Sequence, residues 1–168
     1  MNTPPFQIVA ATRAHVPAIN GMVRELAQYE KLEHLVSGTA ADLETELFGA
    51  QPVIEAVVAL ADATPVGFAL YFHNYSTFLA RKGLYLEDLY VQPALRRRGI
   101  GRAMLIHLAR IAIERGCGRF EWSVLDWNQS AIQFYEGMGA TVMPEWRIVR
   151  ITGDALGILA ARDTCWPA

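Results

Sequence analysis

The sequence predicts one α/β domain, residues 1–168, in which helices flank a mixed central β-sheet. Short β-branched apolar runs alternate along the chain with stripes of apolar residues at helical spacing, and two neighbouring runs have the pattern of a hairpin. With 168 residues, 52% hydrophobic and 19% charged, the chain can bury one sizeable core. No internal repeat or low-complexity linker in the sequence marks a second domain.

The first part of the chain predicts a strand followed by two helices. Residues 6–9 form a short apolar run, and Thr12 is placed to cap a helix whose apolar residues recur at spacings of three and four as far as Leu26. Thr39 and Asp42 have the spacing of a capping box, which predicts a second, short helix immediately after them.

Three strands are expected next. The runs 54–61 and 66–72 flank a connection of four residues and predict an antiparallel hairpin. Residues 84–91 predict the central strand, but its alternation of side chains is interrupted where Glu87 and Asp88 stand side by side. We expect a β-bulge there, because a bulge redirects side chains and is frequent beside active sites.

Helix and strand alternate in the rest of the chain. Apolar spacing predicts a helix over residues 100–115, and Gly116 suits the position that ends it. Alternation over 120–124 predicts a strand, and Asn128 is placed to cap a helix that stops at Gly139. Two final strands are expected at residues 140–143 and 146–151.

The segment Arg96-Arg97-Arg98-Gly99-Ile100-Gly101 lies between the central strand and a helix and has the features of a pyrophosphate-binding loop. Its glycines let the backbone approach a ligand, and the helix after it offers unpaired N–H groups and a positive dipole end. A solvated basic turn is the structural alternative. The Gly-Lys-Ser/Thr ending of triphosphate loops is missing, and Met104 stands where a dinucleotide fingerprint has its third glycine.

Composition restricts the remaining classes. A formal net charge of −2 argues against a general nucleic-acid binder. Cys117 and Cys165 lack metal-ligand spacing and do not make a disulfide framework, and the histidines have no second ligand nearby in sequence. The chain shows neither a basic, apolar leader nor an apolar run long enough to span a bilayer. We therefore expect a cytoplasmic protein with no metal and no membrane association.

Three stretches together resemble the GNAT superfamily of N-acetyltransferases: Leu84–Val91, then Arg96-x-x-Gly99-x-Gly101, then Trp127–Ala140. Within that superfamily, Glu25–Glu30 together with Leu84–Asp88 is similar to the branch of spermidine/spermine and thialysine N-epsilon-acetyltransferases. The resemblance covers residues 6–151. It implies the single-domain GNAT fold, and it implies acetyl-CoA as the co-substrate.

The resemblance also places the coenzyme. The segment Arg96–Gly101, called the phosphate loop below, would hold the pyrophosphate. The end of the central strand would pair with the pantetheine arm, and Asn128 would form a hydrogen bond with the coenzyme. Asn128 suits a plain helix cap equally well. The implied coenzyme-binding residues are Leu89, Tyr90, Val91, Arg96, Arg97, Arg98, Gly99, Ile100, Gly101, Arg102 and Asn128.

Catalysis requires a neutral amine, yet a lysine-like amine has a reference pKa of ~10.4. Glu87 is placed to accept the proton, directly or through a water, and burial would raise its pKa toward neutrality. A structural Glu87 paired with a buried arginine is the alternative. The resemblance implies that Tyr135, about two helical turns after Asn128, protonates the leaving thiolate. Its alternative role is that of a packed aromatic residue.

The resemblance places Tyr29 and Glu30 in the pocket of the acceptor, together with Glu87 and Asp88. Acidic and aromatic side chains suit an ammonium group, although an ordinary solvated helix end explains Tyr29 and Glu30 as well. We expect acetyl transfer to a primary amine of a diamine, polyamine, thialysine-like compound or amino acid. A peptide or protein N-terminal acetyltransferase and a non-catalytic acyl-CoA sensor are the alternatives. The resemblance further implies a homodimer.

Overall fold

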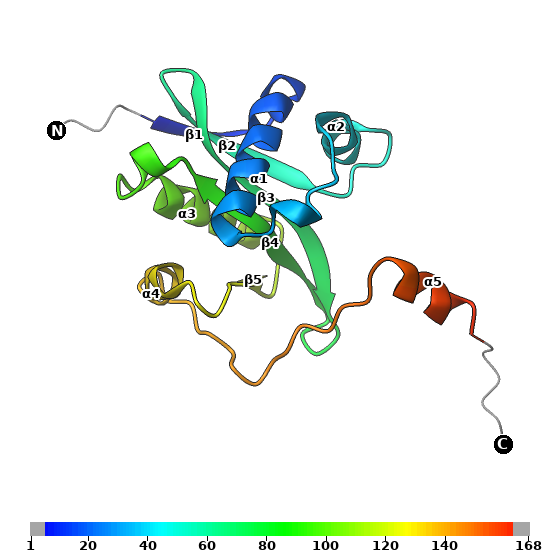
Figure 1. Ribbon diagram of the computed structural model, residues 1–168. Coiled ribbons are helices and arrows are strands. Elements are labelled where there is room, and N and C mark those ends of the chain that lie inside the picture. Colours follow the sequence, from blue (N-terminus) through cyan, green and yellow to red (C-terminus); the bar gives the residue numbers. More distant parts are fainter. Residues whose placement is uncertain (1–5, 163–168) are drawn as a thin grey trace. The chain divides into compact units, whose positions relative to one another are not determined.

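The computed structural model describes residues 6–162 and divides the chain into two compact units, Met1–Leu125 and Asp126–Ala168. The first unit is built on a five-stranded sheet of order β1-β2-β3-β4-β5 (Figure 1). The first four strands pair antiparallel and β5 pairs parallel to β4, so the sheet is mixed, as the sequence predicts. The strands are β1 (Phe6–Ala10), β2 (Glu55–Ala61), β3 (Thr64–Ser76), β4 (Arg81–Val91) and β5 (Phe120–Trp122).

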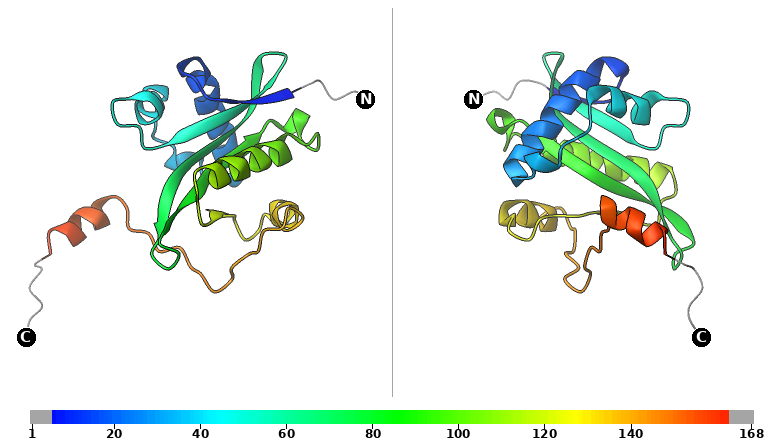
Figure 2. Two further views of the ribbon diagram at one scale, coloured as in Figure 1. Left: turned by 180° about the vertical axis from the view of Figure 1, so that it is seen from behind. Right: turned by 45° about the vertical axis from the view of Figure 1, so that its right-hand side comes forward.

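Three helices complete the first unit: α1 (Val16–Glu30), α2 (Ala40–Phe48) and α3 (Ile100–Glu114). Helices α1 and α2 cover one face of the sheet, and α3 lies on the opposite face (Figure 2). Strand residues alternate between the two layers. Phe68 and Leu70 pack in the core beneath α1 and α2, whereas Met104 and Leu108 of α3 are fully buried against the other face.

The hairpin between β2 and β3 turns more tightly than the sequence predicts. Asp62 and Ala63 both have positive φ, 48° and 63°, as the central residues of a type I′ turn require. Ala61 then pairs with Thr64, so Thr64 and Pro65 belong to β3 and not to the connection. The expected four-residue connection is therefore wrong, because Pro65 marks a strand start here.

The predicted helix boundaries hold at Thr39 and Gly116 but not at Thr12. The Thr39 hydroxyl accepts from the Asp42 N–H at 3.2 Å and the Thr39 N–H donates to the Asp42 carboxylate at 2.9 Å, which completes the capping box of α2. Thr12 precedes the short 3₁₀ turn Arg13–His15, and α1 itself begins at Val16. Gly116 takes a left-handed φ of 68° just after α3.

An ion pair ties the C-terminal end of α3 to the sheet. Arg115, which follows α3, donates two hydrogen bonds to the carboxylate of Glu55 at the start of β2, one of them at 2.7 Å. The Tyr71 hydroxyl also donates to Glu55, at 3.3 Å. The bond from Arg115 is the main cause that holds the pKa of Glu55 below its ordinary value. This contact joins the end of α3 to β2, and the start of α3 directly follows Gly99.

The second unit contains α4 (Gln129–Glu136) and α5 (Asp154–Ala160). The strands expected at 140–143 and 146–151 are wrong: in the described chain these residues form no strand. Apolar alternation alone does not make a strand, because each strand needs a neighbour that satisfies its backbone groups. These residues instead leave large apolar side chains exposed, among them Trp146 at 72% and Val149 at 90%. Cys117 is a free thiol, and Cys165 lies outside the described residues.

Candidate active site

The phosphate loop leads into an uncapped helix. Gly99, the residue before α3, has φ 83°, a left-handed conformation that favours glycine, and no side chain caps the helix there. The first N–H that bonds back into the helix is that of Ala103, which donates to the Gly99 carbonyl at 2.9 Å. The N–H groups of Ile100, Gly101 and Arg102 therefore lack intrahelical acceptors and suit an anionic ligand.

The arginines of this loop divide into two kinds. Arg97, Arg98 and Arg102 are exposed, and Arg97 adopts a left-handed φ of 60° that is uncommon outside glycine. Arg96 is exposed as well, but its Nε donates to the Val91 carbonyl at 2.9 Å. The sequence grouped all four as coenzyme-binding, and that role stays a prediction for each of them.

One edge of β4 is open beside the loop. Its parallel pairing with β5 covers Leu84–Leu86 only, so from Glu87 to Val91 the described chain provides no partner strand on that side. An open edge offers backbone donors and acceptors to an extended ligand. Leu89, Tyr90 and Val91, predicted to pair with the pantetheine arm, lie on this open stretch.

The register between β3 and β4 shifts by one residue at the acidic pair. Leu70 faces Asp88, but the next residue, Tyr71, faces Leu86, so Glu87 is passed over. The shift lies where the sequence predicts a β-bulge, and its class as a bulge stays a prediction. Because opposed residues share a face, Asp88 lies on the same face as Leu70, which is the face covered by α1.

The shift gives the two acids different surroundings. Glu87 is exposed, whereas Asp88 is partly buried, and burial together with the charges of Glu87 and Glu30 raises the pKa of Asp88 to about 6. Burial also raises the pKa of Glu30. The sequence expected burial to act on Glu87, but it acts on Asp88. Among the described residues, no arginine forms an ion pair with Glu87, so the structural alternative for that residue is not realised.

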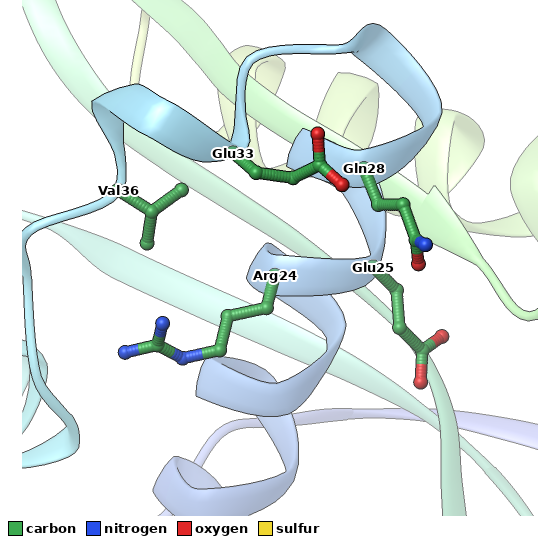
Figure 3. A pocket seen from close by; sticks show the side chains of 5 residues that line it. All are labelled: Arg24, Glu25, Gln28, Glu33 and Val36. Carbon is green, nitrogen blue, oxygen red and sulfur yellow. The ribbon is translucent and has the colours of Figure 1, made fainter.

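Two neighbouring pockets lie along the second half of α1, and Glu25 and Gln28 line both. One is completed by Arg24, Glu33 and Val36, and Figure 3 shows Glu33 reaching toward Gln28 while Arg24 points away. The other is lined by Glu25, Gln28, Tyr29, Tyr90, Pro93 and Arg96. Sequence reasoning singled out Tyr29 and missed Glu25 and Gln28 as lining residues. Gln28 stands three residues after Glu25 and Tyr29 four after it, and this spacing on one helix face was the available signal.

Asn128 and Tyr135 belong to the second unit, where Asn128 is the N-cap of α4 and Tyr135 lies within that helix. The Asn128 carboxamide oxygen accepts from the Ala131 N–H at 3.3 Å, so its role as a helix cap is realised. Tyr135 follows seven residues later, with its ring 5.3 Å from that of Phe134. Within the first unit, Glu30 and Glu87 lie close enough to Asp88 for their charges to raise its pKa, and Arg96 contacts Tyr29 and Tyr90. The coenzyme and acid roles of Asn128 and Tyr135 stay predictions.

Two further observations bear on the kind of site. Among residues 6–162, no cluster of three histidine, cysteine or acidic side chains is arranged to hold a metal ion. In the same range, no helix has both the length and the apolar character needed to cross a membrane.

Comparison with known proteins agrees with this geometry. Residues 22–140 match the acetyltransferase (GNAT) family. Over 195 aligned residues, the chain is 34% identical to L-ornithine N5-acetyltransferase NATA1 of Arabidopsis thaliana, covering 89% of this chain and 86% of that protein. Over 152 residues, it is 38% identical to thialysine N-epsilon-acetyltransferase of Mus musculus, covering 84% and 89%.

A solved structure has the same fold. An integron cassette protein from the mobile metagenome of V. cholerae superposes with a TM-score of 0.78 and 27% identity, covering 94% of this chain and 98% of that one. The resemblance identified in the sequence is confirmed, and the chain belongs to the acetyltransferase (GNAT) family and is an N-acetyltransferase.

Proposed function

We propose that this N-acetyltransferase moves an acetyl group from acetyl-CoA directly to a primary amine of a small molecule. The observation that carries the proposal is Asp88, a partly buried carboxyl with a pKa raised to about 6 on the strand that leads into the uncapped start of α3. The named relatives act on ornithine and on thialysine, both amino acids with a side-chain amine. We extend that class of acceptor to this chain, with diamines and polyamines beside it.

The first unit fits acetyl-CoA, which supplies an activated thioester. The N–H groups at the start of α3, with Arg97, Arg98 and Arg102 around them, suit the pyrophosphate. The open edge of β4 suits the extended pantetheine arm. The backbone N–H groups near Tyr90 and Val91 are candidates to stabilise the oxyanion of the tetrahedral intermediate.

The acidic side chains would bind the acceptor and remove its proton. An ammonium is attracted by Glu30, Glu87 and Asp88 and by the face of Tyr29. A carboxylate whose pKa lies near 6 is a stronger base than an ordinary aspartate, yet it is still ionised at pH 7 and above. We propose that Glu87 and Asp88 accept the proton, directly or through a water, and that Tyr135 protonates the departing thiolate.

We further propose a cytoplasmic homodimer. The support for self-association is the exposed apolar surface of residues 142–159, because large exposed apolar groups gathered in one segment commonly mark an interaction site. A second copy is the partner that the branch resemblance favours. The free thiol of Cys117 is compatible with a reducing compartment.

A thiol-release assay with acetyl-CoA tests the proposed reaction. Ornithine, thialysine, diamines and polyamines are compared with peptides that have a free N-terminus. Turnover with at least one small amine, at a kcat/KM well above that of any peptide, is expected because the acids suit a compact cation. Preferential turnover of peptides would instead favour an N-terminal acetyltransferase, and tight acetyl-CoA binding without any turnover would favour the sensor.

Replacement of Tyr135 by phenylalanine tests the proposed general acid. Loss of the hydroxyl removes the proton donor, so kcat should fall by about 10²-fold or more. Acetyl-CoA affinity, measured by calorimetry, should change little because the ring is retained. Phe134→Leu serves as the control for packing next to it. An unchanged kcat in Tyr135→Phe would remove this residue from the mechanism.

Asp88→Asn tests the base through pH. In the wild type, kcat/KM should fall as the pH drops through about 6, because Asp88 then becomes protonated. The variant should lose this limb and about 10²-fold of kcat/KM at pH 8. Glu87→Gln, as the comparison, should keep the limb. The same limb in Asp88→Asn would assign it to another group.

At pH 8, Asp88→Asn should be more stable than the wild type, although its kcat/KM should be lower. A raised folded-state pKa means that ionising Asp88 costs stability above its unfolded pKa, increasingly as the pH rises to about 6. Asparagine does not ionise, so the variant's thermal midpoint should exceed that of the wild type at pH 8 but not at pH 4. A lower midpoint at pH 8 would contradict this account.

Sedimentation at tens of micromolar tests the homodimer. The wild type should have the mass of two chains, and Val149→Asp should shift it toward one, because a charge in an apolar interface is costly. Glu145→Gln, nearby in sequence, is the control. A wild-type mass of one chain would overturn the proposal.

A further inference from the structure

The side chain of Arg96 is held by three contacts from two elements. Its Nε donates to the Val91 carbonyl at 2.9 Å. Its guanidinium carbon lies 5.2 Å from the ring centroid of Tyr29 and 5.4 Å from that of Tyr90. Both distances are within the range in which a cation is attracted to an aromatic face. Arg96 therefore joins Tyr29 of α1 to Tyr90 of β4.

The two rings stand next to the acids of the acceptor site. Tyr29 immediately precedes Glu30, and Tyr90 follows Asp88 by two residues on β4. Glu30 and Asp88 are close enough for the charge of Glu30 to raise the pKa of Asp88. Arg96 thus contacts a residue that lies next to Glu30 in the chain and one that lies two residues from Asp88.

A second contact fixes Tyr90 in the same place. Its hydroxyl donates to the Glu25 carboxylate at 2.7 Å. Burial first, and Glu25 next, raise the pKa of Tyr90 to about 12, so the hydroxyl stays a donor at any working pH. Arg96, Tyr29, Tyr90 and Glu25 also line one pocket together. The α1–β4 junction is therefore a connected set of polar and aromatic contacts.

Positive charge for an anion is available elsewhere on the loop. Arg97, Arg98 and Arg102 are exposed around the start of α3. Arg96 is exposed too, but its guanidinium lies against two rings and a carbonyl. These three contacts already engage the side chain of Arg96 with α1 and β4.

We propose that Arg96 is a positioning residue for the amine acceptor and not a phosphate ligand. It ties α1 to β4 and so sets the spacing between Glu30 and Asp88. This inference rests on the proposed function, because it names a residue that prepares the same acceptor site. It predicts that Arg96 and its neighbours in the loop serve different substrates.

Arg96→Gln and Arg98→Gln, measured side by side, test the proposal. Arg96→Gln should raise the KM for the amine by about 3- to 10-fold, the size expected for lost ring contacts, and change the Kd for acetyl-CoA less than about twofold. Arg98→Gln should do the reverse. Arg96→Lys keeps the charge but loses the flat guanidinium and the Nε donor, so its amine KM should stay raised. Thermal midpoints confirm that each variant is folded.

A double-mutant cycle separates positioning from general damage. If Arg96 acts through Tyr29, then Tyr29→Leu and Arg96→Gln should raise the amine KM together by less than the product of their single effects. Additive effects would overturn the proposal. So would an Arg96→Gln variant that weakens acetyl-CoA binding as much as Arg98→Gln does.

The failure of the proposed function has a different signature. If the wild type transfers acetyl to no amine, that function is wrong, and with it the role of Arg96 toward the acceptor. The Kd for acetyl-CoA still shows whether Arg96 binds phosphate.

Discussion

The one-residue shift in pairing between β3 and β4 is the constraint on which the site depends. Side chains alternate along a strand, so a shift of one residue exchanges the faces of everything beyond it. Leu84 and Leu86, before the shift, are fully buried, and Tyr71, which faces Leu86, contacts the residue at the end of α3. Without the shift, Asp88 would share the face of these leucines, where an unpaired carboxylate is costly.

The shift also determines the surroundings of the later residues of β4. Tyr90 joins the core beneath α1, opposite Phe68, and becomes available to Glu25 and Arg96. The surroundings of Asp88 and the contacts of Tyr90 therefore both depend on one local irregularity. An active site that combines a partly buried acid with a basic loop needs to keep the two apart. Here Asp88 lies on β4, and the loop follows the end of that strand.

Much of the fold was predictable because its signals are local. The Thr39–Asp42 capping box, the spacing of apolar residues over 100–115 and Gly116 each specify an element within a few residues, and the structure realises all three. The expected strands at 140–143 and 146–151 did not form, since pairing depends on a distant partner that no local pattern reveals. The features of the candidate site also divide into those with a local signal in the sequence and those that depend on tertiary packing.

The loop and the acidic pair were visible in the sequence, because glycines and adjacent acids interrupt regular patterns. The sequence did not reveal that Asp88 is partly buried while Glu87 is exposed. That difference depends on which residue of β4 is left without a partner in β3. The contacts of Arg96 were equally hidden, because Tyr29 lies far away in the chain and only tertiary packing brings it near.

The missing cap of α3 has a consequence for the protein as a whole. With Gly99 at the N-cap and no side chain bonded to the first turn, the helix forgoes roughly a few tenths of a kcal/mol that a serine or aspartate would contribute there. An anionic ligand bound to those N–H groups would accept the hydrogen bonds that a capping side chain would otherwise accept. Because such a ligand favours only the folded chain, resistance to unfolding would rise with its concentration. The supply of coenzyme would then regulate the lifetime of the enzyme as well as its rate.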